Sequence, residues 1–397
     1  MSRTPKTMRF RHVLGVGAAM LVVASCAGPG QGPADTSNIK VGVLTVLSGP
    51  NADGGTHILN AGKLAAAQFN KAGGVNGRKL EVIAEDDQCD AQVGAQAAEK
   101  VVAGGAVAVA GGYCSGATIP EVGVLTRHSS LPYVVAIASN PKVTQQGYDN
   151  VFRIISADDV TAPVQASFMI DYKKFKRIAI LHDNSTFGKG LADAGKAAIQ
   201  SHGGADIVYF DAINPGQQDY SSNVTKIASL KPDVLLYTAY YAEAAVIAKE
   251  IHDLGLNFAF MGTAGIADPQ FIKVAGPAAN GVTLISLLLT ELTTGAQASS
   301  FKSDYKSAYG VDAGTYDIYE YDAMMVLGQA LKKAGSTKPA DLRAALKSTN
   351  YTGLTGQVQF GSTGDRSGKP PLVALTVANG QFAIYATQHP DGSWSTA

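Results

Sequence analysis

The sequence has no excess of charge of one sign. Its 32 lysines and arginines balance 32 aspartates and glutamates, so the formal net charge is zero. No block of like charges stands out along the chain. Proteins that bind nucleic acid or an anionic membrane surface normally carry a basic patch. The composition therefore argues against a nucleic-acid partner.

The sequence also lacks the short motifs on which common catalytic and cofactor sites are built. It has no Gly-x-x-x-x-Gly-Lys-Ser/Thr phosphate loop, and no Gly-x-Gly-x-x-Gly follows its first predicted strand. The run Gly-Tyr-Cys-Ser-Gly at 112–116 does not place glycines two residues on either side of the serine, as a nucleophile elbow requires. The seven histidines form no His-x-x-x-His pair, and no Cys-x-x-Cys occurs. We therefore expect no enzymatic activity, no cofactor and no metal site.

Cysteine is scarce, and the first of the three follows a segment typical of an export signal. Four basic residues precede an apolar run at 13–23, which is too short to span a bilayer but suits a signal-peptide core. The run leads into Val-Ala-Ser-Cys, which resembles a bacterial lipobox. Residues 1–26 are therefore predicted to be a lipoprotein signal peptide ending at lipidated Cys26, and residues 27–38 a flexible tether. An ordinary secretion signal with an incidental cysteine is the alternative.

The other two cysteines then form an even pair. Cys89 and Cys114 would lie in an oxidising compartment after export, where disulfides persist. The sequence predicts a disulfide between them, and two buried free thiols are the alternative. In either case Cys114 is a poor candidate for a nucleophile.

From residue 39 onward, short β-rich runs alternate with longer helical segments. Such strands, flanked by helices, indicate parallel sheets covered on both faces. Two consecutive series of them indicate two doubly wound α/β lobes. The strands are expected at 39–47, 79–87, 106–112 and 131–139 in the first series, and at 177–183, 205–211, 232–238, 258–262 and 281–286 in the second. Helices are expected at 57–72, and throughout 296–349, before a hairpin-rich C-terminal segment.

The run Gly-Gly-Tyr-Cys-Ser-Gly-Ala-Thr at 111–118 ends a predicted strand and begins a helix. Ligands of such sheets bind beyond the carboxyl ends of the strands. Backbone N–H groups and the positive end of the helix dipole make this start an anion site, and Gly116 allows a close approach to the backbone. The loop has no basic residue, which favours a carboxylate over a phosphate. The alternative is plain helix capping by Ser115 or Thr118, with Glu121 completing a capping box.

Several of these segments together resemble a known family. The runs at 39–50, 70–90, 111–120 and 177–194 are similar to those of the leucine/isoleucine/valine-binding proteins, which are type I periplasmic substrate-binding proteins of ABC importers. The resemblance extends from Ile39 to about Gly276. It implies two lobes joined by three crossings, with the ligand in the cleft between them. Lobe 1 would comprise 39–157 and about 286–363, and lobe 2 would comprise 158–285 and about 364–397.

The resemblance also implies roles for individual residues. Ser115 falls on the serine that binds the ligand carboxylate, and Ser139 falls where the family has a threonine with the same role. Ile137 would direct its carbonyl at the ammonium. Phe187, Tyr240 and, less closely, Tyr316 match aromatic positions that line the ligand, whereas core packing is the alternative for Tyr240 and its neighbours Tyr237 and Tyr241. The full ligand-binding set expected is Ser115, Gly116, Ile137, Ser139, Phe187, Tyr240, Tyr316 and Asp317.

One departure from the family pattern affects the ligand. The branched-chain binders carry a glutamate where this chain has Ala264. A buried ammonium without a counter-charge is costly. Either another acid reaches it, with Asp317, Asp183 and Asp268 as candidates, or the ligand has no ammonium.

The expected function is that of a monomeric, lipid-anchored binding protein at the outer face of the cytoplasmic membrane. It would deliver a branched-chain or related amino acid to the permease subunits of an ABC importer. A ligand-sensing receptor module and a binder of a non-amino small carboxylate or amide are the alternatives. An exported enzyme is a third class, for which the sequence offers no coherent catalytic set.

Overall fold

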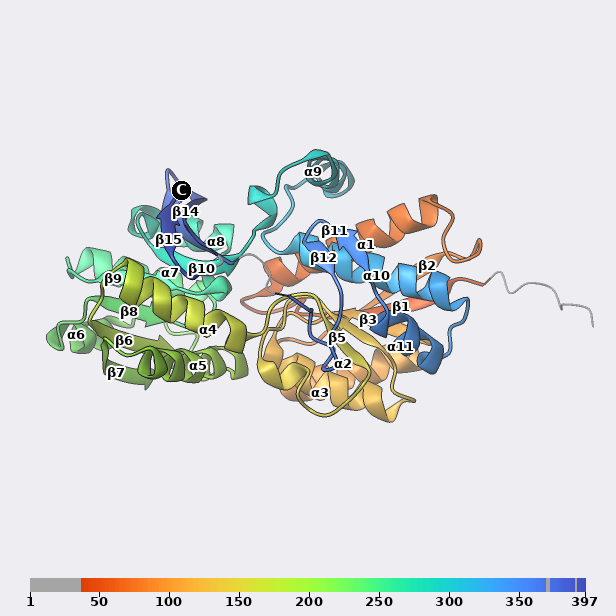
Figure 1. Ribbon diagram of the computed structural model, residues 1–397, viewed down its shortest axis with the longest axis horizontal. Helices are drawn as coiled ribbons and strands as arrows, with labels where there is room; N and C mark the ends of the chain where they lie inside the picture. Colours follow the sequence, from red (N-terminus) through yellow and green to blue (C-terminus); the bar gives the residue numbers. More distant parts are fainter. Residues whose placement is uncertain (1–36, 369–371, 390) are drawn as a thin grey trace, which may run out of the picture. The chain divides into compact units, whose positions relative to one another are not determined.

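Two β-sheets, each covered by helices, organise the part of the chain that the structure describes (Figure 1). The structure is a computed structural model that describes residues 37–368, 372–389 and 391–397. The predicted signal peptide with Cys26, and all but the last two residues of the predicted tether, lie outside these residues. Within them, no helix has the length and hydropathy needed to cross a membrane.

The first sheet is parallel throughout and has the strand order β2-β1-β3-β4-β5. Its strands are β1 (Ile39–Thr45), β2 (Leu80–Asp86), β3 (Ala108–Gly111), β4 (Tyr133–Val135) and β5 (Val151–Arg153). Alternating side chains fill both of its faces, as the period of a strand dictates. Val41 and Val43 belong to the large hydrophobic core, whereas Leu44 belongs to a second cluster on the opposite face.

The second sheet has the order β15-β14-β13-β10-β9-β8-β6-β7 and is parallel from β7 to β10. Its parallel strands are β6 (Arg177–His182), β7 (Asp206–Ala212), β8 (Val234–Tyr237), β9 (Ala259–Gly262) and β10 (Thr283–Leu287). Antiparallel strands extend it, namely β13 (Leu372–Ala378), β14 (Gln381–Gln388) and β15 (Trp394–Thr396). A separate hairpin pairs β11 (Tyr351–Gly353) with β12 (Gly356–Val358).

Helices cover both sheets. α1 and α10 pack together on one side of the first sheet, and α2 and α3 pack together on the other (Figure 1). The helices are α1 (Ala52–Lys71), α2 (Ala91–Ala103), α3 (Ser115–Arg127), α4 (Asp158–Ser167), α5 (Thr186–His202), α6 (Ser221–Ser229), α7 (Tyr241–Asp253), α8 (Pro269–Ala275), α9 (Ala296–Tyr309), α10 (Asp317–Ala334) and α11 (Pro339–Lys347).

The chain changes sheets three times. It passes from β5 to β6, returns from β10 to α10, which contacts β3 and β4, and re-enters the second sheet at β13. The prediction of two doubly wound α/β lobes joined by three crossings is therefore confirmed.

Two helical segments differ from the sequence-based expectation. α1 begins at Ala52 rather than at 57, because Gly54 and Gly55 are helical. A β-carbon at Gly55 would collide with the carbonyl oxygen of Val46, so this glycine permits close helix–strand packing and does not break the helix. The region 296–349 is three helices, since Gly310 and Gly335 end α9 and α10 in the left-handed conformation.

Candidate functional site

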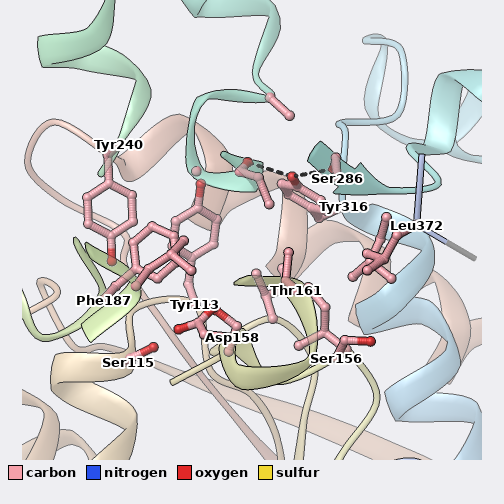
Figure 2. Close-up of a pocket in the computed structure, with 18 of the residues that line it drawn as sticks. Tyr113, Ser115, Ser156, Asp158, Thr161, Phe187, Tyr240, Ser286, Tyr316 and Leu372 are labelled. Atoms are coloured by element: carbon pink, nitrogen blue, oxygen red, sulfur yellow. Dashed lines mark hydrogen bonds between the residues drawn. The ribbon is translucent and has the colours of Figure 1, made fainter. Parts of the chain in front are cut away.

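A pocket lies where loops from the carboxyl ends of both sheets meet, and Figure 2 shows its lining. Its walls come from the loops after β3 and β4, the starts of α4, α5 and α7, and the loop after β9. Six of the predicted ligand-binding residues line this pocket, namely Ser115, Ile137, Ser139, Phe187, Tyr240 and Tyr316.

The loop after β3 is shaped by glycine and by a disulfide. Gly111 and Gly112 have φ values of 110° and 80°, and a β-carbon at Gly111 would collide with the Leu44 carbonyl oxygen. Cys114, which precedes α3, forms a disulfide with Cys89 of the loop after β2, with Cα atoms 5.1 Å apart. The disulfide therefore fixes the residue before Ser115.

Ser115 is the first helical residue of α3 and does not cap it. The preceding Cys114 occupies the N-cap position without a side-chain capping bond. The capping box of the alternative interpretation is absent, because Thr118 donates to the Cys114 carbonyl oxygen at 3.1 Å and Glu121 accepts from the Tyr133 hydroxyl at 2.9 Å. The buried Ser115 hydroxyl oxygen instead accepts from the Asn140 N–H at 3.2 Å. The capping alternative for Ser115 and Thr118 is therefore wrong.

The start of α3 presents unused donors. Among the described residues, none accepts a hydrogen bond from the backbone N–H of Ser115 or Gly116. Such groups at a helix start, reinforced by the helix dipole, form an anion site. The pocket side of α3 is thus suited to a carboxylate.

The loop after β4 brings Ser139 beside this helix start. The Ile137 and Ala138 N–H groups both donate to the Gly112 carbonyl oxygen, at 3.2 and 2.8 Å. The fully buried Arg153 donates to the Asn140 carbonyl oxygen at 2.8 Å and forms an ion pair with Asp365. These bonds fix the loop that carries Ser139.

The second lobe contributes an aromatic wall. Phe187 is the second residue of α5, and Tyr240 immediately precedes α7, with ring centroids 5.2 Å apart. Gly265 makes room for Phe187, because a β-carbon there would lie 2.7 Å from its ring. The Tyr316 hydroxyl donates to the Ala264 carbonyl oxygen at 2.6 Å, and it lies 3.4 Å from the Ser286 hydroxyl oxygen (Figure 2).

The pocket lining contains two acids and, among the described residues, no lysine, arginine or histidine. Burial raises the pKa of Asp158 to about 7, and burial raises the pKa of Asp268 to about 6. Asp268 also caps α8, since its carboxylate accepts from the Gln270 N–H at 2.7 Å. In the ligand-free pocket, burial therefore favours the neutral form of both carboxyls.

Some predicted residues lie elsewhere. Gly116 is not among the residues that line the pocket, and a β-carbon added to it would point toward Thr186 and the Cys89 carbonyl oxygen. Asp317 is fully buried beside a neighbouring cavity, where its carboxylate accepts from the Gly314 N–H at 2.6 Å and lies 3.3 Å from His57.

Asp268, the remaining candidate for the missing acid, lines the pocket, and so does Tyr240. Asp183 and the neighbouring tyrosines Tyr237 and Tyr241 do not. Asp183 accepts from the side chain and the backbone N–H of Ser185. Tyr237 is fully buried in the core, and the Tyr241 hydroxyl donates to the Pro50 carbonyl oxygen at 2.8 Å.

The sequence did not indicate the polar wall formed by α4. Asp158, Thr161 and Gln165 share one helix face and line the pocket. The second carboxyl oxygen of Asp158 and both amide atoms of Gln165 are buried without a hydrogen-bond partner among the described residues. The spacing i, i+3, i+7 of polar residues was the available signal, but it is equally typical of a solvent-facing helix.

The described residues contain no group of three or more histidine, cysteine, aspartate or glutamate side chains placed to hold a metal ion. The site therefore offers hydrogen bonds, aromatic contacts and carboxylates to a ligand.

Comparison with known proteins places the chain in a family. Residues 38–381 match the periplasmic binding protein family. The Leu/Ile/Val-binding protein BraC3 of Rhizobium johnstonii is 34% identical over 84% of this chain and 90% of its own length.

Solved structures share the fold. The branched-chain amino acid transporter substrate-binding protein LivJ from Streptococcus pneumoniae, in complex with isoleucine, has a TM-score of 0.80 and 24% identity, covering 87% of this chain and 98% of its own. A solute-binding protein from R. palustris, in complex with benzoate, has a TM-score of 0.79 and 21% identity, covering 87% of this chain and 95% of its own. The chain belongs to the periplasmic binding protein family and is a relative of the Leu/Ile/Val-binding proteins.

Proposed function

We propose that the chain is the extracytoplasmic solute-binding protein of an ABC importer, and that it binds a branched-chain or related amino acid without transforming it. The observation that carries this proposal is the meeting of Ser115 and Ser139 at the free N–H groups of α3, inside a pocket walled by Phe187 and Tyr240. A carboxylate bound there accepts hydrogen bonds from backbone and hydroxyl groups. The aromatic wall then packs against an apolar side chain.

The relatives support the same ligand class. BraC3 of Rhizobium johnstonii is named for binding leucine, isoleucine and valine. A 29% identical protein of Pseudomonas aeruginosa is named for binding leucine, isoleucine, valine, threonine and alanine. Permease subunits of an ABC importer are the partners that this role requires.

A second candidate function is the binding of a small carboxylate without an amino group. Ala264 favours it, because the position at which the family has a glutamate carries no charge here. The two pocket acids oppose it, since a bare carboxylate would approach them without a balancing cation.

The test is calorimetric titration of the full chain, freed of co-purifying ligand by unfolding and refolding, with L-leucine, L-isoleucine and L-valine. Micromolar or tighter binding of at least one supports the proposal. Absence of binding to all three, with binding of 4-methylpentanoate, favours the second candidate.

The remaining proposals concern location and organisation. We propose that Cys26 carries a lipid anchor, that the protein is a monomer, and that the lobes have the boundaries given above. Replacement of Cys26 by alanine should move the protein from the detergent phase to the aqueous phase. Retention in the detergent phase would contradict the anchor.

A further inference from the structure

We infer that the neighbouring cavity, beside the ligand pocket, is a second binding site and takes an organic cation with an ammonium or guanidinium group. The cavity has a volume of about 250 Å³, compared with about 30 Å³ for one water molecule in the liquid. It is lined by the first turns of α1, the start of α8 and the segment 311–317 that leads into α10. The inference goes beyond the proposed function and does not depend on which ligand the pocket takes.

Two buried oxygen atoms in the lining of this cavity lack hydrogen-bond partners. Asp317 lines the cavity and is fully buried, and its Oδ1 atom has no partner among the described residues. The hydroxyl of Thr315, another lining residue, is likewise buried and without a partner in the described part of the chain. A buried acceptor without a partner is costly, and more so when it is charged. An ammonium or guanidinium group has donors for both oxygen atoms and accepts nothing in return.

Carboxylates outnumber basic side chains around the cavity. Among the described residues its lining has one basic side chain, His57, and four acids, Asp53, Asp268, Asp312 and Asp317. The hydrogen bond to Asp317 raises the pKa of His57, and Asp312 pairs with Lys306 at 2.9 Å.

The other two acids, Asp53 and Asp268, belong to no ion pair of the described residues. Burial raises the pKa of Asp268 to about 6, and a cation bound beside it would favour its ionised form. Charge complementarity at this cavity therefore calls for a ligand that is positively charged.

Local packing holds the acceptors in place. Asp317 Oδ2 accepts from the Gly314 N–H at 2.6 Å and lies 3.3 Å from His57 Nδ1. Tyr305 stacks on the His57 ring, and its hydroxyl donates to the His57 carbonyl oxygen at 3.2 Å. A β-carbon at Gly314 would lie 2.7 Å from the His57 ring, so glycine allows the segment before α10 to pack against α1. A site whose groups are fixed in this way pays less to order them when a ligand binds.

The lining suits an organic cation better than a metal ion. No group of three histidine, cysteine, aspartate or glutamate side chains is placed to hold a metal ion in the residues that the structure describes. Tyr113 and Tyr316, which line the pocket as well as the cavity, instead provide aromatic surface near the acids (Figure 2). Aromatic rings attract ammonium and guanidinium groups.

The shared wall allows two sources for the cation. Tyr113, Tyr316 and Asp268 line both the pocket and the neighbouring cavity. One source is the charged end of a long ligand that extends from the pocket into the cavity. The other is a separate small amine that binds beside the ligand of the pocket. The experiment has one arm for each source.

The first arm titrates matched amino acids calorimetrically into the full chain, freed of co-purifying ligand. L-arginine is compared with L-citrulline and L-lysine with L-norleucine, because each pair differs chiefly in side-chain charge. The second arm titrates agmatine and n-butylammonium, with and without saturating L-leucine. Both arms are repeated with Asp317→Asn, with Thr315→Val and with the control Asp193→Asn. Asp193 is an exposed acid that pairs with Lys189 and does not line the cavity.

We expect one cationic amino acid to bind at least about tenfold more tightly than its neutral partner, or one amine to bind with millimolar or tighter affinity. Asp317→Asn should weaken binding of that cation by roughly 10- to 100-fold, and Thr315→Val by roughly tenfold, as loss of a hydrogen bond to a charged group does. The neutral amino acids should bind both variants within about threefold of wild type. Asp193→Asn should bind every probe as the wild type does.

Two results would overturn the inference. The absence of any cation preference and of any amine binding in the wild type would show that the cavity holds water only. A cation affinity that is unchanged in Asp317→Asn would place the cation elsewhere. Far-UV circular dichroism and the melting temperature show whether each variant folds. Should Asp317→Asn fail to fold, Thr315→Val decides in its place by the same criterion.

The same titrations separate the inference from the proposed function. Binding of L-leucine, L-isoleucine or L-valine, without any cation preference or amine binding, would uphold the proposed function and overturn the inference. Binding of agmatine that depends on Asp317, without binding of those three amino acids, would do the reverse.

Discussion

The backbone N–H of Asn140 donates a hydrogen bond to the hydroxyl oxygen of Ser115 at 3.2 Å. This bond joins the loop after β4 to the start of α3 and occupies the hydroxyl oxygen as an acceptor. The hydroxyl proton remains available to a ligand carboxylate. Asn140 also donates from its side chain to the Thr186 carbonyl oxygen at 2.9 Å, so the same residue links the carboxylate site to the helix that carries Phe187.

Replacing Ser115 by alanine should weaken ligand binding by roughly 10- to 100-fold, because a hydrogen bond to a charged group contributes about 1.5–3 kcal/mol. The variant should also lose about 1 kcal/mol of unfolding free energy with the Asn140 bond. Ser185→Ala is the matched control, since Ser185 caps α5 by accepting from the Gly188 N–H at 2.8 Å. It should lose a similar stability and keep its affinity. Calorimetric titration measures the ligand affinity of both variants. If Ser115→Ala bound the ligand as tightly as Ser185→Ala, the role of Ser115 in binding would be contradicted.

Replacing Gly265 by alanine should weaken binding at least tenfold. The added β-carbon would lie 2.7 Å from the Phe187 ring and would overlap the Ala239 carbonyl oxygen, so the aromatic wall must shift. Overpacking of this kind typically costs about 1–3 kcal/mol. Gly123→Ala is the control, because no atom lies within 4 Å of the added carbon in α3. Its melting temperature should not fall, and an unchanged affinity in Gly265→Ala would show that the wall does not contact the ligand.

Because Cys89 and Cys114 form a disulfide, neither should carry a free thiol in the exported protein. Labelling of the denatured, unreduced Cys26→Ser variant should find no free thiol, and reduction should release two. Replacement of both cysteines by serine should lower the unfolding free energy by about 3 kcal/mol, on the chain-entropy estimate for a loop of this length. Two labelled thiols before reduction would contradict the disulfide.

The fold and part of the site were predictable because they depend on patterns that are local in sequence. Apolar strands separated by helices predicted both lobes, and the rule that ligands lie beyond the carboxyl ends of parallel strands singled out the loops of Ser115 and Ser139. The resemblance to a family then added Phe187 and Tyr240, which come from the second lobe and have no local motif of their own. All four line the pocket.

Of the two acids in the pocket lining, Asp268 was among the sequence-based candidates, whereas Asp158 was not predictable in the same way. Asp158 in the first turn of a helix is an ordinary placement, favoured by the helix dipole. Its proximity to Ser139 arises only when the first crossing folds back against the loop after β4. Asp317 shows the reverse error. It directly follows the pocket residue Tyr316, but Tyr316 lines both the pocket and the neighbouring cavity, whereas Asp317, the first residue of α10, lines the neighbouring cavity alone.

Gln165→Met should raise the melting temperature of the ligand-free protein. Both amide atoms of Gln165 are fully buried without a hydrogen-bond partner among the described residues, and such burial costs about 1–3 kcal/mol. Methionine has a similar shape and no amide to desolvate. Thr161→Val, on the same helix face, is the comparison, because the Thr161 hydroxyl donates to the Ala157 carbonyl oxygen at 3.4 Å. The melting temperature of Thr161→Val should therefore rise by less than that of Gln165→Met. A lower melting temperature in Gln165→Met would indicate that ordered water satisfies the amide.

The titration of Asp158 should make stability and binding respond to pH in opposite ways. Burial raises its pKa to about 7 in the folded protein, from an ordinary value of 3.8 in the unfolded chain. Between these values the folded state holds a proton that the unfolded state has lost. The unfolding free energy of the ligand-free protein should therefore fall as the pH rises from about 4 to about 7. Asp87 and Asp268, with pKa values raised by burial to about 6, add to the same slope.

Ligand affinity should change in the other direction. Under the proposed function, the ammonium of an amino acid in the pocket favours the ionised form of Asp158, so the affinity should weaken below pH 7, by at most tenfold per pH unit. The charged groups that interact with Asp158 are Arg153, which lowers its pKa, and Asp159, which raises it. Calorimetric titrations from pH 5.5 to 8.5, in buffers of different ionisation enthalpy, measure both the affinity and the protons released. Asp158→Asn should abolish this pH dependence of its residual affinity. An affinity that rises as the pH falls would mean that the protonated carboxyl donates to the ligand, and that the ligand lacks an ammonium.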